Sequence, residues 1–129
     1  MVLVDTTVWI DFFAGRKEAH VLSLQELIEI EEDLSICGII LAEVLQGIRS
    51  DADYTKTKGY LGDLIFLPMR HATFVQAAEI YRSLRMKGVA VRKPVDCMIA
   101  SVAIEYNVKL LHNDRDFNHI AKRSKLRII

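Results

Sequence analysis

The chain has 129 residues, of which 51% are hydrophobic and 26% are charged, and its 17 basic side chains balance 17 acidic ones. This length fits a single domain, residues 1–129, with enough apolar residues to fill a core, which excludes a disordered chain and a metal-stapled miniprotein. The charges are unevenly divided, because residues 1–64 hold 12 acids and 5 bases whereas residues 65–129 hold 5 acids and 12 bases. Two separate roles for charge are therefore expected.

Short apolar segments alternate with helical patterns along the chain. In chain order the pattern predicts a strand at 2–4, a helix capped by Thr6 or Thr7, a helix at 18–32, a strand at 34–37, helices at 39–49 and 52–64, a strand at 65–68, helices at 72–87 and 94–106, and strands at 109–112 and 126–129. This order indicates an α/β fold with a short central parallel sheet of about five strands and helices on both faces.

The amino terminus carries no secretion or membrane signal. The segment MVLVD has neither a basic region nor a long apolar region, so we expect a cytoplasmic protein without membrane contact. Cys37 and Cys97 lie 60 residues apart, with no CxxC motif or Cys/His cluster. This arrangement argues against a zinc site and a disulfide scaffold, and it predicts two reduced core residues.

Carboxylates occur at the ends of several predicted elements. The set comprises Asp5 after the first strand, Glu43 and Asp96 near the starts of two helices, and Asp114 and Asp116 after the strand at 109–112. Each acid taken alone has a structural explanation as a turn, cap or first-turn residue. Because the carboxyl ends of parallel strands meet at one edge of a sheet, however, we expect these acids to gather there.

A gathered set of carboxylates needs neutralisation. Two like charges about 4 Å apart repel by about 4 kcal/mol at an effective dielectric constant near 20. Either raised pKa values or a bound divalent cation can relieve this repulsion. Since all the proposed ligands are oxygen atoms, we expect Mg²⁺, with Mn²⁺ as the alternative, and chemistry on a phosphodiester.

Four segments resemble the successive signature segments of PIN-domain nucleases, and most closely those of VapC-family toxins from type II toxin-antitoxin pairs. The segments are VLVDTTVWIDFF, IILAEVLQGI, PVDCMIASVAIE and HNDRDF, in that order over the whole chain. The resemblance implies a PIN-like fold and a Mg²⁺-dependent endoribonuclease with one or two ions. It also implies a homodimer and a toxin-antitoxin hetero-oligomer, in which a cognate VapB-like antitoxin covers the active-site groove and inhibits the toxin.

The resemblance also assigns roles to individual residues. It places catalytic and metal-binding acids at Asp5, Glu43, Asp96 and Asp114, an accessory metal-binding acid at Asp116, and supporting hydroxyl groups at Thr6 and Thr7. On this hypothesis Asp5 and Asp96 are the central ligands, while Glu43 and Asp114 hold a second ion or orient the attacking water. The choice between Asp114 and Asp116 as the direct ligand stays open.

One position departs from the family pattern. His112 stands two residues before Asp114, where the family often has Thr or Ser. The histidine either alters the hydrogen bonds around the site or simply places a polar ring at the strand end, and we favour the second interpretation.

Basic residues are concentrated in the second half of the chain. Between Ile80 and Val95 there are five bases and no acid. These bases either form an ordinary solvated surface or hold RNA phosphates beside the acidic site. The predicted RNA-binding residues are Arg82, Arg85, Arg92, Lys93 and Arg115. For Arg115 the alternative is that it neutralises its acidic neighbours, and we rank the two roles equally.

Apolar residues of the first and third predicted helices offer anchors for an antitoxin, or else belong to the core. They are Trp9, Phe12, Phe13, Leu45 and Ile48. Two alternatives to a toxin are an RNA-processing PIN nuclease without an antitoxin and a non-catalytic PIN-like module that binds RNA or protein.

Overall fold

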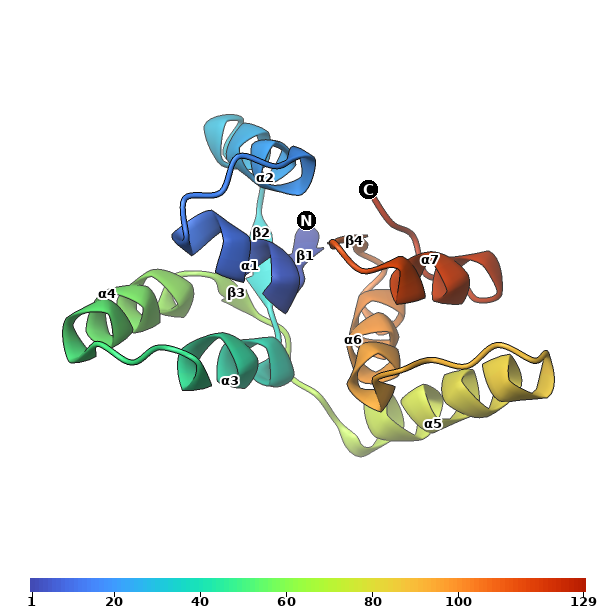
Figure 1. Ribbon diagram of the computed structural model, residues 1–129. Coiled ribbons are helices and arrows are strands. Elements are labelled where there is room, and N and C mark those ends of the chain that lie inside the picture. The colour runs from blue at the N-terminus through green and yellow to red at the C-terminus, as the bar shows by residue number, and fades with distance from the viewer.

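Seven helices and four short strands alternate along residues 1–129 in the computed structural model (Figure 1). The strands are β1 (Val2–Val4), β2 (Leu34–Ile36), β3 (Ile65–Phe66) and β4 (Lys109–Leu111). The helices are α1 (Thr6–Phe13), α2 (Ala19–Glu29), α3 (Gly38–Gln46), α4 (Asp51–Gly62), α5 (His71–Met86), α6 (Pro94–Glu105) and α7 (Arg115–Lys122). The alternation confirms the predicted α/β fold. None of the helices is both long enough and apolar enough to cross a bilayer.

The four strands form one parallel sheet in the order β3-β2-β1-β4. The segment predicted as a fifth strand, 126–129, runs beside β4 through a single parallel bridge between Leu110 and Ile128. The Leu110 N–H donates to the carbonyl oxygen of Arg127, and the Ile129 N–H donates to that of Leu110. The chain end thus extends the sheet over too few residues to make a full strand.

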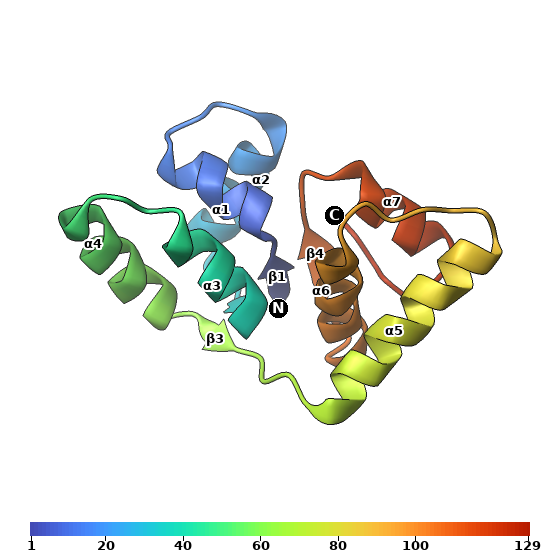
Figure 2. The same ribbon diagram turned by 60° about the horizontal axis from the view of Figure 1, so that its bottom comes forward.

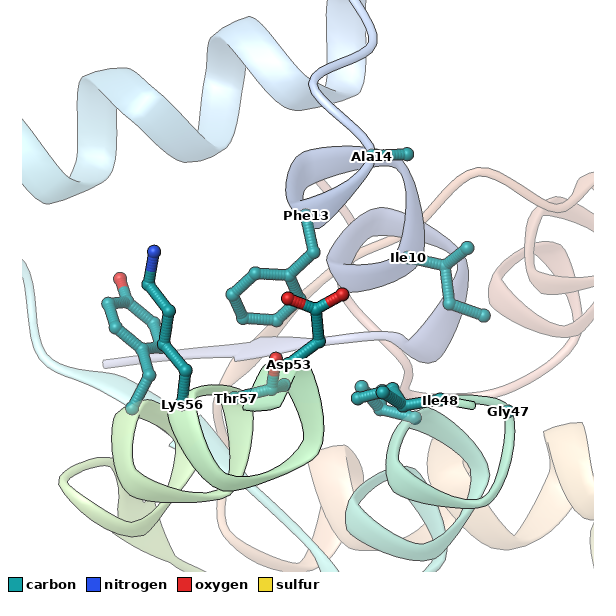
Figure 3. A pocket seen from close by; sticks show the side chains of 10 residues that line it. Ile10, Phe13, Ala14, Gly47, Ile48, Asp53, Lys56 and Thr57 are labelled. Carbon is teal, nitrogen blue, oxygen red and sulfur yellow. The ribbon is translucent and has the colours of Figure 1, made fainter. Parts of the chain in front are cut away.

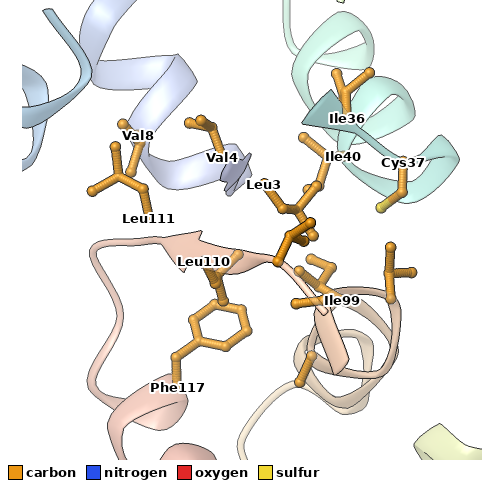
Figure 4. Packing of buried hydrophobic residues seen from close by; sticks show 14 of the residues in the cluster. Leu3, Val4, Val8, Ile36, Cys37, Ile40, Ile99, Leu110, Leu111 and Phe117 are labelled. Atoms are coloured by element: carbon orange, nitrogen blue, oxygen red, sulfur yellow. The ribbon is translucent and has the colours of Figure 1, made fainter. Parts of the chain in front are cut away.

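Side chains cover both faces of the sheet, as expected for parallel strands. Adjacent residues of a strand point to opposite faces, and Figure 4 shows Leu111 directed toward Val8 of α1 and Leu110 directed toward Phe117 of α7. All four side chains are at most 2% exposed. Helices α1 to α4 lie on one side of β1 and β4, and helices α5 to α7 lie on the other (Figure 2). The site described below lies where these two groups of helices meet.

The two cysteines confirm their predicted role. Cys37 and Cys97 are free thiols and are both buried in the hydrophobic core. Burial, together with the charges of Asp96 and Asp116, raises the pKa of the Cys97 thiol to about 11. Neither thiol is paired, which agrees with the absence of a disulfide scaffold.

One predicted helix start needs correction, and one helix is missing from the prediction. The N-cap of α1 is Asp5, whose side chain accepts from the Thr7 N–H, so neither Thr6 nor Thr7 caps this helix. Helix α7 was not predicted at all, although Asp114 caps it in the same way by accepting from the Asp116 N–H. Both caps follow a strand directly, and a carboxylate is a better cap than a hydroxyl because it also meets the positive end of the helix dipole.

The other boundaries lie within three residues of the prediction. The largest differences are at the end of α2, at Glu29 instead of Glu32, and at the end of α3, at Gln46 instead of Arg49. Glu31 adopts a left-handed backbone conformation with φ of 57°, which cannot continue a right-handed helix. Gly47 is the C-cap of α3, and Pro94 opens α6 at the predicted residue.

Candidate active site

The site is built from residues that follow β1 and β4 in the chain. Val4 of β1 pairs with Leu111 of β4, and the Asp5 N–H donates to the Leu111 carbonyl oxygen over 2.9 Å. The Asn113 N–H donates to the Thr7 hydroxyl over 3.2 Å. These contacts bring the start of α1 beside the loop that leads into α7.

Three of the five predicted acids form a compact group here, and the other two are linked to it by their charges. Asp96, Asp114 and Asp116 each offer a carboxylate oxygen within 4.8 Å of the others. The charge of Asp5 raises the pKa of Asp96, and the charge of Glu43 raises the pKa of Asp5. Asp5, Asp96 and Asp116 are buried, while Glu43 and Asp114 are half-buried. Glu43 is the sixth residue of α3 and not a helix-start residue as expected.

Asp96 is a buried acid with one carboxylate oxygen that lacks a partner. Its side chain is 2% exposed, and its Oδ2 atom is buried without any hydrogen-bond partner. Burial raises the pKa of Asp96 to about 7, with the charges of Asp5, Asp114 and Asp116 adding to the rise and that of Lys93 opposing it. Buried polar atoms in native proteins almost always have a partner. An unpartnered oxygen surrounded by other carboxylates fits a divalent cation that prefers oxygen ligands.

Two threonine hydroxyls hold two of the acids in place. The Thr7 hydroxyl donates to Oδ2 of Asp5 over 2.7 Å, and the Thr6 hydroxyl donates to Oε1 of Glu43 over 2.8 Å. Burial nevertheless raises the pKa of Asp5, because it outweighs the hydrogen bonds from Thr7. The two adjacent threonines thus position one acid from α1 and one from α3.

Two of the bases predicted to bind RNA lie inside the acidic cluster. The Arg92 guanidinium donates to Oδ1 of Asp114 over 3.1 Å and to Oδ2 of Asp116 over 3.2 Å. Lys93 places its Nζ 3.2 Å from Oδ2 of Asp114. Burial raises the pKa of Asp114, but the Asp116 N–H and the two bases outweigh it and hold that pKa below its ordinary value. Arg92 and Lys93 therefore neutralise part of the negative charge of the acidic cluster.

The other three predicted RNA-binding residues stand apart from these contacts. Arg82 and Arg85 lie on the exposed surface of α5, and Arg115 is exposed at the first turn of α7. None of them forms an ion pair with the five acids. The Arg85 guanidinium lies 5.8 Å from the centre of the Tyr81 ring.

His112 does more than occupy the strand end. Its Nδ1 accepts a hydrogen bond from the Asp114 N–H over 3.1 Å, and its ring lies 5.2 Å from that of Phe117. Burial lowers the pKa of His112, which favours a neutral ring with its proton on Nε2. The favoured interpretation of His112 needs correction, because the ring helps to fix the backbone that carries Asp114.

A second group of titratable residues lies between α1 and α2. His20 Nε2 is 2.6 Å from Oδ2 of Asp11, and Arg16 Nη1 is 3.3 Å from the other Asp11 oxygen. Glu18 lies 3.8 Å from Nδ1 of His20. Because both oxygens of Asp11 already have cationic or hydrogen-bonding partners, this group ties the two helices together and offers no oxygen with an unmet requirement.

The structure also contains a largely apolar cavity of about 660 Å³ (Figure 3). It lies between α1, the end of α3 and α4, and its lining includes Ile10 and Phe13 of α1 and Val44 of α3. Ile10 is 48% exposed and Phe13 is 39% exposed. Helices α1 and α3 also carry Thr6 and Glu43, so the cavity and part of the acidic site are formed by the same two helices.

The predicted apolar anchors divide between core and cavity. Trp9 is fully buried, and its ring stacks on that of Phe13 with centroids 5.8 Å apart. Phe13 and Ile48 line the cavity, whereas Phe12 and Leu45 pack partly against the core. The contribution of α4 was missed by sequence reasoning. It supplies Asp53, Lys56, Thr57 and Tyr60 to the lining.

Comparison with known proteins agrees with this fold. The PIN domain profile matches residues 2–123. The chain is 32% identical over 128 residues to Ribonuclease VapC11 of Mycobacterium tuberculosis strain H37Rv, covering 98% of this chain and 96% of that protein. The chain therefore belongs to the PIN-domain family, and within that family it groups with the VapC proteins.

Solved structures support the same assignment of the fold. The chain superposes on VapBC2 from Rickettsia felis, bound to a DNA fragment from its promoter, with a TM-score of 0.78 and 20% identity, over 100% of this chain and 98% of that chain. It superposes on DNA-bound VapBC from Salmonella typhimurium with a TM-score of 0.76 and 25% identity, over 99% of this chain and 96% of that chain.

Proposed function

We propose that this chain is a Mg²⁺-dependent endoribonuclease that hydrolyses RNA phosphodiester bonds and acts as the toxin of a toxin-antitoxin pair. The observation that carries the proposal is the group of Asp96, Asp114 and Asp116, to which Asp5 is coupled by charge, together with the unpartnered Oδ2 of Asp96. The similarity to a named ribonuclease over nearly the whole chain supports the choice of RNA as substrate.

Four acids would hold the metal: Asp5, Glu43, Asp96 and Asp114. All contribute carboxylate oxygens, which favours Mg²⁺, with Mn²⁺ as the alternative, and the site admits one or two ions. A bound divalent ion supplies an activated water at neutral pH and stabilises negative charge on the phosphoryl oxygens. Asp116 serves as the accessory acid, because its Oδ2 already accepts from the backbone and side chain of Arg92.

The chain's own residues prepare the site before substrate arrives. Thr7 and Thr6 hold Asp5 and Glu43 in fixed orientations, so these acids need no reorganisation on binding. Asp5 and Asp114 are the N-caps of α1 and α7, and Asp96 lies in the first turn of α6. The positive ends of three helices therefore point toward the cluster and offset part of its repulsion.

RNA needs positive charge nearby, because a set of carboxylates alone repels phosphates. Arg92 and Lys93 stand at the acids, and Arg82, Arg85 and Arg115 are exposed on α5 and α7. We assign these five bases to phosphate contacts. The division of labour is then chemical, with acids holding the metal and bases holding the RNA backbone.

The partner proposed for the apolar cavity is a VapB-like antitoxin. The cavity has an apolar lining and exposes Ile10 and Phe13, features that accept an apolar anchor from a protein partner. Because it shares α1 and α3 with the acidic site, a segment seated there would lie next to the acids and hinder RNA. We further propose that the protein is cytoplasmic and forms a homodimer, which joins the antitoxin in a hetero-oligomer.

A cleavage assay tests the proposed function. Purified protein is incubated with total RNA, with Mg²⁺ or with a chelator, beside the Asp96→Asn variant. We expect cleavage only by the unmodified chain with metal, and inhibition by the antitoxin encoded beside it. Cleavage that survives the chelator, or equal cleavage by the variant, contradicts the metal site. Cleavage without an inhibitor indicates an RNA-processing nuclease, and metal binding without cleavage indicates a binding module.

A further inference from the structure

The two bases in the acidic cluster are held very differently. Arg92 makes three contacts, from Nη2 to Asp114, from Nε to Asp116 and from its backbone N–H to Asp116, over 3.1, 3.2 and 3.3 Å. Lys93 makes one, from Nζ to Oδ2 of Asp114 over 3.2 Å. A guanidinium forked across two carboxylates is held by several contacts at once, whereas an ammonium on a flexible stem with one contact exchanges more readily.

We propose that Lys93 is the resident counterion of the metal-free site, and that a divalent cation displaces its ammonium group from Asp114 while Arg92 stays in place. This inference rests on the proposed metal-dependent function and adds a step to it. Metal binding becomes an exchange of one cation for another, and the step makes Asp114 a direct ligand.

The contacts of the carboxylate oxygens of Asp114 and Asp116 support Asp114 as a direct ligand. Oδ1 of Asp114 accepts from the Asp116 N–H over 2.9 Å and from Arg92, so it has no room for an ion. Oδ2 of Asp116 accepts twice from Arg92. Oδ2 of Asp114 contacts only Lys93, so it becomes available as soon as that side chain moves.

The electrostatic effect of Lys93 on Asp96 also supports the exchange. Lys93 precedes Asp96 by three residues, and its charge lowers the pKa of that acid. A divalent ion at the unpartnered Oδ2 of Asp96 would replace this stabilisation and repel the ammonium group at once. The Lys93 side chain is 49% exposed, so it can swing into solvent without repacking the core. Lys93 would then reach an RNA phosphate only after the metal is bound.

Lysine ammonium NMR follows the displacement directly. An ammonium group held against a carboxylate gives a ¹H–¹⁵N signal protected from solvent exchange, and the Lys93→Arg variant identifies it by its loss. We expect this signal in the metal-free protein and expect Mg²⁺ titration to shift or broaden it away. A signal that persists unchanged in protein shown by calorimetry to be Mg²⁺-bound overturns the inference and leaves the proposed function intact. Absence of Mg²⁺ and Mn²⁺ binding overturns both.

Metal affinity supplies an independent readout. Removing the competing charge in Lys93→Met is expected to raise Mg²⁺ affinity about three- to tenfold, in line with the modest strength of a half-exposed ion pair. The matched control is Lys125→Met, an exposed base without an acidic partner, which should leave affinity unchanged. Equal or weaker affinity in Lys93→Met, with the fold verified by circular dichroism, contradicts the exchange.

Discussion

Replacing Asp96 with Asn should stabilise the metal-free protein at alkaline pH while removing its activity. The carboxyl group is buried, and its pKa is raised from 3.8 to about 7, so the folded state binds this proton more tightly than the unfolded state. Its contribution to stability is complete below pH 3.8 and is lost as the pH rises through about 7. The full difference corresponds to about 4 kcal/mol at alkaline pH.

The amide introduced at position 96 offsets part of this stabilisation. Its donors would lie in the same buried position as the unpartnered Oδ2, which costs about 1–3 kcal/mol. The net expectation is that Asp96→Asn is more stable than the unmodified chain by about 1–3 kcal/mol near pH 8 and about equally stable near pH 5. The variant gains stability and loses activity, because in the unmodified chain a bound metal would supply the positive charge that neutralises the buried carboxylate.

Urea denaturation in the presence of a chelator measures this difference at the two pH values. Mg²⁺ added at about 100 times its Kd should then stabilise the unmodified chain by about 2.7 kcal/mol and the variant by much less. Asp33→Asn, at an exposed position, serves as the control without a comparable pH dependence. A variant whose stability relative to the unmodified chain is the same at both pH values would refute the argument that Asp96 is held as a strained buried acid.

Three further predictions concern the supporting residues. Thr7→Val removes the hydroxyl that orients Asp5 and should lower the single-turnover cleavage rate by about 10–100-fold, whereas Thr7→Ser should not. Ile10→Asp places a charge in the apolar cavity and should weaken antitoxin binding in calorimetry by about 30-fold or more with cleavage unchanged. His20→Ala removes the buried hydrogen bond to Asp11 and should lower the free energy of unfolding by about 1.5–3 kcal/mol, unlike His71→Ala at an exposed position.

Each of these predictions has an outcome that contradicts it. Full cleavage by Thr7→Val would show that the hydroxyl does not position Asp5. Unchanged antitoxin affinity in Ile10→Asp would place the antitoxin on another surface. An unaltered urea midpoint in His20→Ala would show that the contact between α1 and α2 does not contribute to stability.

The acidic cluster was predictable because it depends on few assumptions. Parallel strands end at one edge of a sheet, so the acids that follow β1 and β4 are expected at the same edge. Asp5 and Asp114 lie together because Val4 pairs with Leu111. Their second role as helix caps follows from the same position, directly after a strand and before a helix.

Features that depend on loop paths and packing were not predictable. The contacts of Arg92 and Lys93 with the acids require the segment after α5 to return across the start of α7, and no local pattern encodes that path. The cavity needs α4 to lie against α1, although α4 buries only Thr57 and Leu61. Helix α7 did leave a signal, with Asp114 as its cap and Phe117 and Ile120 at helical spacing.

A crystal structure of the protein soaked in Mn²⁺, with anomalous scattering recorded, tests the central claim most directly. We predict a peak bounded by oxygens of Asp5 and Asp96, with Asp114 Oδ2 in contact and the Lys93 ammonium moved away. A structure with manganese only at Asp11 and His20, or with no peak among the five acids, would contradict the account.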